Sequence, residues 1–235
     1  MSDGEAPVFP AEQGETLRRM EGASHYNRWL LTRAAPYLGA RVLDVGAGIG
    51  TFTDLIADGR TVVALEPDPA FVPHLRRRFA QRDSVEVVAG HLDSLGRERF
   101  DSVVCFNVLE HIADDAGALR SIHDLLEPGG WLLALVPAHP AAFGSIDVAL
   151  GHERRYTRRL LAGRLTEAGF RAKTLRHVNP LGIVGWFVAS RIMREPQVPS
   201  TPLRLFDQLV PVLRELDRLR LPFGLSLWTV ARRPG

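Results

Sequence analysis

The chain is poor in cysteine and lysine. Cys105 is the only cysteine in 235 residues, so no disulfide forms within the chain, and its apolar neighbours predict a buried core residue rather than a nucleophile. Lys173 is the only lysine among 29 basic residues, a bias typical of a GC-rich bacterial genome. The net charge is only +2, and no basic stripe alternates with aromatic side chains, so nucleic acid is not an expected partner.

Long hydrophobic runs are also absent. The most apolar stretch, residues 180–190, is far shorter than the roughly 20 residues that span a bilayer, so stable membrane insertion is not expected and only a peripheral contact stays open. The first ten residues contain Asp3, Glu5 and prolines but no apolar signal-peptide core, which predicts a cytoplasmic location. The length predicts a flexible segment over residues 1–23 and a single domain over residues 24–235.

The most informative stretch is a glycine-rich turn. An aliphatic run ends at Asp44, and Gly46, Gly48 and Gly50 then alternate before a helical pattern begins. Because backbone approaches a ligand closely only where side chains are absent, these glycines predict a ligand-facing turn between a strand and a helix. Glu66 ends the next aliphatic run, where its carboxylate can accept both hydroxyls of a ribose. Together the residues predict a site for a nucleoside-containing cofactor.

The spacing of the turn separates two classes of cofactor. Dinucleotide sites use G-x-G-x-x-G, in which a helix N-terminus faces a pyrophosphate. Here the pattern is G-x-G-x-G, and the Asp44 carboxylate before it would repel a pyrophosphate but could accept hydrogen bonds from an ammonium group. S-adenosylmethionine (SAM) carries an ammonium, a sulfonium and a ribose. The turn resembles the first motif of the class I SAM-dependent methyltransferases.

Strand-like and helix-like segments alternate along the chain. This order predicts right-handed crossovers and a parallel sheet covered by helices on both faces. The predicted strands are 41–45, 61–66, 84–88, 100–106, 131–136, 170–177 and 225–232, and the predicted helices are 16–22, 25–37, 50–58, 68–80, 115–126 and 157–168. Ligands of such sheets lie beyond the carboxyl ends of the strands, where Asp44 and Glu66 are both placed.

The family resemblance sharpens this fold prediction. It implies an α/β domain with a seven-stranded, mostly parallel sheet, helices on both faces and an antiparallel last strand. Residues 178–224 interrupt the hairpin that closes the sheet in relatives, and we interpret them as a helical cap over the acceptor pocket. Extra core and a dimer face are the alternatives for this insertion. The chain is accordingly expected to be a monomer or a homodimer.

Further segments match the same family. The run 100–111 resembles its fourth motif, residues 127–130 resemble the turn before its fifth strand, and residues 25–29 resemble an N-terminal helix that covers the cofactor. His91 replaces the acid that holds the adenine amino group, so the Leu92 backbone or Asp93 is the expected substitute. The resemblance implies these cofactor-binding residues: Tyr26, Asp44, Gly46, Ala47, Gly48, Gly50, Glu66, Pro67, His91, Leu92, Asn107, Val108 and His111.

The same region raises the question of a metal. Some methyltransferases that resemble it bind a divalent metal through Glu-x-x-Glu-His. Here Asn107 replaces the first acid, and an amide is a weaker ligand for a hard cation. The side chains of Glu110 and His111, adjacent in sequence, would point about 100° apart on a regular helix. The sequence alone therefore predicts no metal, a structural Glu110, and His111 at the cofactor or acceptor cavity.

The chemistry of methyl transfer directs attention to histidines. Transfer from a sulfonium is an in-line displacement that usually requires removal of a proton from the nucleophile, and histidine suits that role with an unperturbed pKa of about 6.5. His139 follows the fifth strand, and His152 opens a loop before a helix. We predict that at least one of these two is the general base. A capping or surface role is the alternative for each.

The loop after His152 contains two further candidates. Arg155 could pair with a carboxylate or phosphate of the acceptor, and Tyr156 could orient an acceptor hydroxyl. The predicted activity is methyl transfer from SAM to an oxygen or nitrogen of a small, partly apolar molecule of natural-product, isoprenoid or quinone type. A SAM-binding enzyme that catalyses a reaction such as cyclisation, or a non-catalytic SAM-binding protein, is the alternative.

Overall fold

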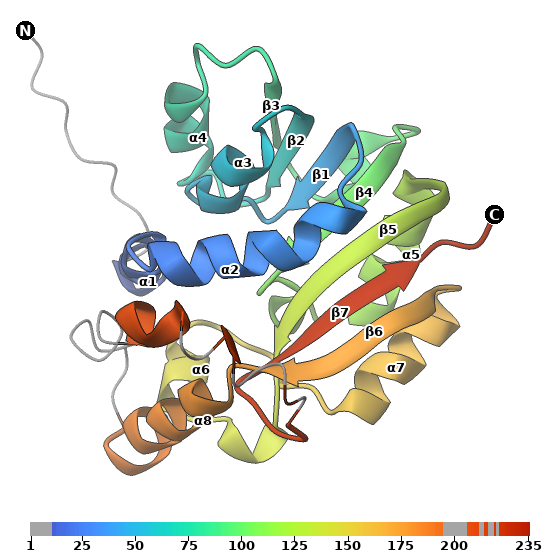
Figure 1. Cartoon of the computed structure of the whole chain (residues 1–235). Helices are drawn as coiled ribbons and strands as arrows, with labels where there is room; N and C mark the ends of the chain where they lie inside the picture. The colour runs from blue at the N-terminus through green and yellow to red at the C-terminus, as the bar shows by residue number, and fades with distance from the viewer. Residues whose placement is uncertain (1–10, 195–205, 212–213, 216–218, 220) are drawn as a thin grey trace, which may run out of the picture.

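A computed structural model describes residues 11–194, 206–211, 214–215, 219 and 221–235. Seven strands form one sheet in the order β3-β2-β1-β4-β5-β7-β6 (Figure 1). The strands are β1 (Arg41–Val45), β2 (Thr61–Glu66), β3 (Val85–Ala89), β4 (Phe100–Phe106), β5 (Leu126–Pro137), β6 (Arg171–Val178) and β7 (Ser226–Arg232). Strands β1 to β5 pair in parallel, and β7 runs antiparallel between β5 and β6. The predicted sheet is therefore confirmed.

The helices cover both faces of this sheet. They are α1 (Ala11–Glu21), α2 (Ser24–Ala34), α3 (Thr51–Ile56), α4 (Val72–Arg78), α5 (Asp115–Leu125), α6 (Ser145–Ala149), α7 (Arg158–Glu167) and α8 (Pro180–Phe187). Shorter turns are η1 (Ala35–Tyr37), η2 (Leu92–Leu95), η3 (Leu109–His111), η4 (Pro140–Ala142) and the π-helical η5 (Val188–Ile192). No helix within the described residues combines the length and apolarity needed to cross a bilayer.

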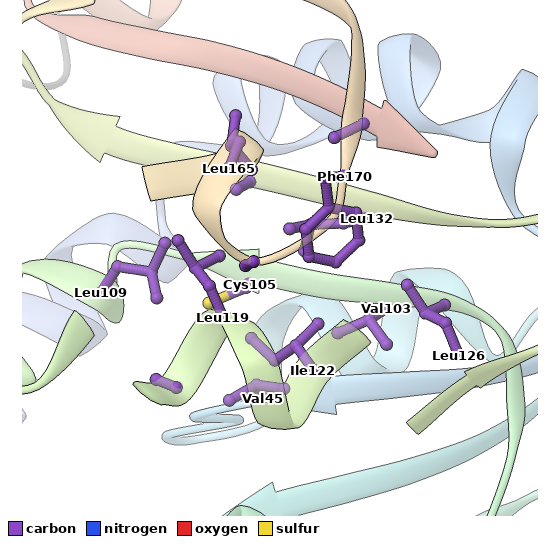
Figure 2. Packing of buried hydrophobic residues seen from close by; sticks show 14 of the residues in the cluster. Val45, Val103, Cys105, Leu109, Leu119, Ile122, Leu126, Leu132, Leu165 and Phe170 are labelled. Atoms are coloured by element: carbon purple, nitrogen blue, oxygen red, sulfur yellow. The ribbon is translucent and has the colours of Figure 1, made fainter. Parts of the chain in front are cut away.

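Neighbouring residues of the central strands bury their side chains on opposite faces of the sheet, as the pleat requires. Val42 packs with Leu30 of α2 and Ile56 of α3, whereas Leu43 lies in the cluster that includes α5 and α7. Figure 2 shows this second cluster, in which Leu119 and Leu165 from the two helices lie close to strand residues. Cys105 lies in the same cluster and is fully buried, as its sequence context predicts.

The strand order reverses between β1 and β4, so the carboxyl ends of these two strands form the topological switch point, where sheets of this kind bind ligands. Helices α1, α6 and α8 lie at this end of the sheet in Figure 1. The turn after β1, the turn after β4 and the loop after β5 therefore meet in one region.

Several element boundaries differ from the prediction. Strand β5 begins at Leu126, because Leu126 pairs with Phe100 before an irregularity in the ladder, and Gly129 adopts a φ of +84°. Helix α1 begins at Ala11, within the segment predicted to be flexible, and its Leu17 packs with Ile49 and Phe71. Helix α6 was not predicted, because five residues are too few to show a helical period. The domain boundary at residue 24 stays a prediction.

The insertion after β6 is described in part. Helix α8 and η5 follow β6, and residues 206–211 are helical. The proline-rich stretch 195–205 and the residues around Pro211 at 212–213 lie outside the described residues. Asp207 accepts hydrogen bonds from the backbone N–H groups of His25 and Tyr26, at 3.3 and 2.9 Å. Because α2 has no side-chain cap of its own, Asp207 supplies one from the insertion.

Candidate functional site

The turn after β1 has a backbone geometry that favours glycine. Gly46, Gly48 and Gly50 have φ values of +68°, +57° and +87°. The N–H groups of Gly46 and Ala47 both donate to the carbonyl of Leu65, at 2.8 and 3.0 Å, which ties the turn to β2.

Each glycine of the turn lacks a side chain for a different reason. A Cβ at Gly46 would lie 2.6 Å from Val108 Cγ2, and one at Gly50 would lie 2.7 Å from Phe79. A Cβ at Gly48 would lie 3.2 Å from Leu17 of α1. Gly50 is thus needed for the packing of α3 against α4, and Gly46 for the close approach of the two turns at the switch point.

Glu66 ends β2 with its carboxylate fixed by two backbone donors. Gly48 N–H donates to Oε2 at 2.7 Å, and Asp68 N–H donates to Oε1 at 2.9 Å. Burial raises the pKa of this carboxyl, and the two backbone hydrogen bonds oppose the shift. Each carboxylate oxygen has more than one acceptor site, so both can still accept a hydroxyl. Pro67 follows directly and is exposed.

Asp44 lies in β1, two residues before Gly46, and is buried, with only 4% of its surface exposed. Its Oδ2 accepts a hydrogen bond from Thr53 Oγ1 at 2.6 Å. Burial raises the pKa of Asp44 to about 7, with Thr53 opposing the shift and Glu66 adding to it. The two predicted carboxylates therefore interact electrostatically, as expected for residues at the ends of neighbouring strands.

The remaining predicted cofactor residues differ in their exposure and in their contacts. His91 is exposed and close enough to Glu66 to affect its pKa, while Leu92 packs against the core. Asn107 is exposed with a φ of +54°. Tyr26 is buried, packs on Phe206 and hydrogen-bonds Ser226, so its hydroxyl is already engaged within the protein.

A cluster of polar side chains lies just beyond β4. Ligand-type atoms of Glu110, His111 and His152 lie within 4.8 Å of one another. The two imidazole rings meet edge to face, with centroids 4.8 Å apart. Burial, and then His152, lowers the pKa of His111 to about 4, whereas burial raises the pKa of Glu110 to about 8. Both shifts favour the neutral forms.

Asp147 of α6 supports this cluster. Its Oδ1 accepts from His152 Nδ1 at 2.8 Å and from Arg155 Nε at 2.7 Å. Burial raises the pKa of Asp147, but its hydrogen bond with His152 and its pairing with Arg155 outweigh burial and lower it. Because a carboxylate can only accept, Nδ1 of His152 carries the proton, and Nε2 makes no hydrogen bond within the part of the chain that the structure describes. No sequence pattern pointed to Asp147, since α6 itself was not predicted.

The two loop residues predicted to contact the acceptor, Arg155 and Tyr156, are both buried. Arg155 is 2% exposed, pairs with Asp147, donates to the Ala138 carbonyl and lies 4.6 Å from the Trp186 ring centroid. Its pairing with an acceptor anion is therefore not supported. Tyr156 is 1% exposed, and its hydroxyl lies 2.9 Å from Asp115 Oδ2. This geometry favours a role in holding the core over the predicted role of orienting an acceptor hydroxyl, which stays a prediction.

His139 is separate from the cluster around His152. Its Nε2 accepts a long hydrogen bond, 3.4 Å, from Gly224 N–H, and its ring stacks on His177 with centroids 4.8 Å apart. With Nε2 engaged, its neutral form carries a proton on Nδ1. The structure thus brings His111 and His152 together and leaves His139 with His177.

Comparison with known proteins gives this geometry a family. A model of the methyltransferase domain matches residues 18–175. The chain belongs to the class I SAM-dependent methyltransferases. SAM is the cofactor of this family, as the turn after β1 predicts.

Relatives of this methyltransferase domain extend the comparison. The chain is 34% identical over 167 residues to a probable S-adenosylmethionine-dependent methyltransferase of Mycolicibacterium smegmatis, a match that covers 65% of this chain and 63% of that protein. It is 34% identical over 116 residues to the ubiquinone biosynthesis O-methyltransferase of Dinoroseobacter shibae, covering 47% of this chain and 46% of that protein. The matches thus span between about half and two thirds of these relatives' own lengths.

A solved structure confirms the fold of the methyltransferase. Phosphoethanolamine N-methyltransferase 2 of Haemonchus contortus, in complex with SAM, is similar with a TM-score of 0.63. The similarity covers 89% of this chain and 52% of that chain at 20% identity. At this identity the similarity concerns the fold alone.

Proposed function

We propose that this protein transfers a methyl group from SAM to an oxygen or nitrogen of a small, partly apolar molecule. The observation that carries the proposal is the contact between Gly46 and Val108. It joins the cofactor turn after β1 to the segment that continues, within three residues, into His111. A cofactor at the turn and an acceptor at the histidine cluster would therefore be neighbours.

The residues present fit SAM at the carboxyl ends of β1 and β2. Glu66 offers two anchored carboxylate oxygens to a ribose, and Asp44 offers a buried carboxylate toward the amino-acid end of the cofactor. When bound, SAM supplies the electrophilic methyl group. The protein's part is to fix both reactants so that the nucleophile is aligned with the methyl carbon.

The histidine cluster fits the acceptor end better than His139 does. His152 is oriented by Asp147 through Nδ1, and Nε2 has no partner among the described residues, which is the arrangement of an oriented imidazole. His139 instead uses Nε2 within the protein. We infer that the acceptor's nucleophilic atom binds beside His111 and His152.

The apolar character of the acceptor is supported by the insertion. Leu181, Val184 and Phe187 of α8 are 48%, 60% and 44% exposed. Trp186 of the same helix contacts Arg155, so α8 stands next to the histidine cluster. Relatives named as ubiquinone biosynthesis O-methyltransferases support an oxygen acceptor of quinone type.

The test is an assay of purified protein with methyl-labelled SAM and a panel of small phenols, hydroxylated quinone precursors and amines. The expected result is release of demethylated cofactor together with a product that gains one methyl group. Cofactor binding with a product of unchanged mass would favour the cyclisation alternative. Cofactor binding without any product from the phenols, the quinone precursors or the amines would contradict the proposal.

A further inference from the structure

We propose that Glu110, His111 and His152 form a binding site for a first-row transition-metal dication of the zinc type. One ligand atom from each side chain lies within 4.8 Å of the other two. Glu110 and His111 come from the turn η3 after β4, and His152 comes from the loop after α6. The structure thus joins two segments far apart in the sequence, which is why the sequence alone predicts no metal.

The Glu110 carboxylate points to a missing cation. The residue is fully buried, and neither carboxylate oxygen accepts a hydrogen bond from another residue that the structure describes. A buried carboxylate without a partner is costly, and such groups are normally paired or bound to a metal. Arg155 is the nearby cation, but its Nε is bonded to Asp147 and its Nη1 to the Ala138 carbonyl. Its buried Nη2 makes no hydrogen bond to Glu110 or to any other residue that the structure describes. A dication among the three side chains would supply the absent partner.

Both histidines have the second contact that metal-binding histidines use. His152 Nδ1 donates to Asp147 Oδ1 at 2.8 Å, and His111 hydrogen-bonds the backbone of Gly151. Such outer contacts fix the tautomer and direct the other ring nitrogen at the metal. One nitrogen of each ring is thereby left for coordination. Asp147 is in turn held by Gly144 N–H at 2.9 Å, so the arrangement is built into α6.

The donor set selects the class of metal. Two imidazoles and one carboxylate suit zinc and its first-row neighbours, whereas magnesium and calcium prefer oxygen donors. Zinc bonds of about 2.0–2.1 Å in a tetrahedral site need ligand atoms about 3.3 Å apart, so the cluster must close by up to about 1.5 Å. The exposed Asn107, in the place of the first acid of Glu-x-x-Glu-His, is not part of the proposed donor set.

Three protein ligands leave one coordination position open, as in catalytic rather than structural zinc sites. This consequence rests on the proposed function. If the acceptor's oxygen binds beside His111 and His152, the metal would hold it there and lower its pKa. His152 would then be a ligand and positioning residue rather than the base.

Calorimetry with Zn²⁺ alone tests the site without SAM or an acceptor. The chelator-treated protein is expected to bind one equivalent of Zn²⁺ and to bind Mg²⁺ at least tenfold more weakly. Glu110→Gln and His152→Gln should each weaken Zn²⁺ binding at least tenfold, and Asp147→Asn by about 10- to 100-fold through its contact with His152. His74→Gln, on α4 and outside the cluster, is the matched control and should leave the affinity unchanged.

A measurement on the unmodified protein avoids dependence on variants that fail to fold. Co²⁺ in place of Zn²⁺ should give the visible absorption of a four- or five-coordinate histidine–carboxylate site and should raise the unfolding temperature. The proposal is overturned if Zn²⁺ binds more weakly than about 1 mM. It is also overturned if His111→Gln/His152→Gln retains full affinity while remaining folded. Because these readouts need no turnover, a negative result leaves the proposed methyl transfer to be judged by its own assay.

Discussion

Asp207 Oδ1 accepts the backbone N–H of Tyr26 at 2.9 Å, so a residue of the insertion caps helix α2. The same carboxylate lies 3.0 Å from Nδ1 of His25 through Oδ2. Helix α2 packs on β1 through its buried face, so this contact links the insertion to the sheet. The insertion is therefore anchored at a defined point beside the cofactor end of the sheet.

The first prediction concerns this cap. Asp207→Ala should lower the free energy of unfolding by about 1–2 kcal/mol, the usual cost of a lost N-cap. Urea unfolding followed by circular dichroism measures the loss. Asp83→Ala, at an exposed position, is the control and should change stability little. Equal losses in the two variants would show that Asp207 does not cap α2.

The second prediction separates backbone strain from crowding in the turn. Gly46→Ala and Gly59→Ala both place alanine at positive φ, +68° and +73°, and each should lose about 1 kcal/mol of stability. Only Gly46→Ala also crowds Val108, because a Cβ at Gly59 meets nothing within 4 Å. It should therefore lose about 1–3 kcal/mol more and bind SAM less tightly. Indistinguishable unfolding curves would refute the close approach of the two turns.

The third prediction concerns pH. Burial raises the pKa of Asp44 to about 7 in the folded protein, whereas in the unfolded chain it is near 3.8. Between these values the folded state binds more protons, so without cofactor the free energy of unfolding should fall as pH rises from about 4 to 7, by at most about 1.4 kcal/mol per pH unit. Asp44→Asn should flatten this decline. The exposed Asp58→Asn should not, and an unchanged slope in Asp44→Asn would contradict the assignment.

The fourth prediction distinguishes a structural from a catalytic phenol. Tyr156→Phe removes the donor to Asp115 and should cost about 1–2 kcal/mol, because a buried carboxylate loses one partner while its ion pair with Arg164 at 3.1 Å remains. Affinity for SAM should not change. Tyr37→Phe, which leaves the ring packed on Trp131, should be nearly neutral. A large loss of turnover in Tyr156→Phe with native stability would restore the catalytic role.

The sheet could be predicted because its signals are local. Aliphatic runs such as Val62 to Leu65 show strands buried on both faces, and the glycines after Asp44 show a turn that no other residue type enters readily. The positions of Asp44 and Glu66 then follow from parallel topology alone. These features need no knowledge of distant contacts.

The acceptor side could not be predicted because it depends on contacts between segments far apart in the chain. The partner of His152 is Asp147 in a helix too short to recognise, and the neighbour of both is Glu110, which follows a different strand. Tyr156 looked available in the sequence because nothing nearby indicates its bond to Asp115. The polar residues themselves can be read from the sequence, but which of them pair with one another cannot.

Cofactor binding at Glu66 tests the central claim most directly. Calorimetry should show that SAM and its demethylated product bind one site in the unmodified protein. Glu66→Gln should weaken binding of both by about 10- to 100-fold, because the ribose hydroxyls lose a charged acceptor. Glu86→Gln, exposed on the neighbouring β3, should bind both as the unmodified protein does. Absence of binding to the unmodified protein at several hundred micromolar, or full affinity in Glu66→Gln, would contradict the account.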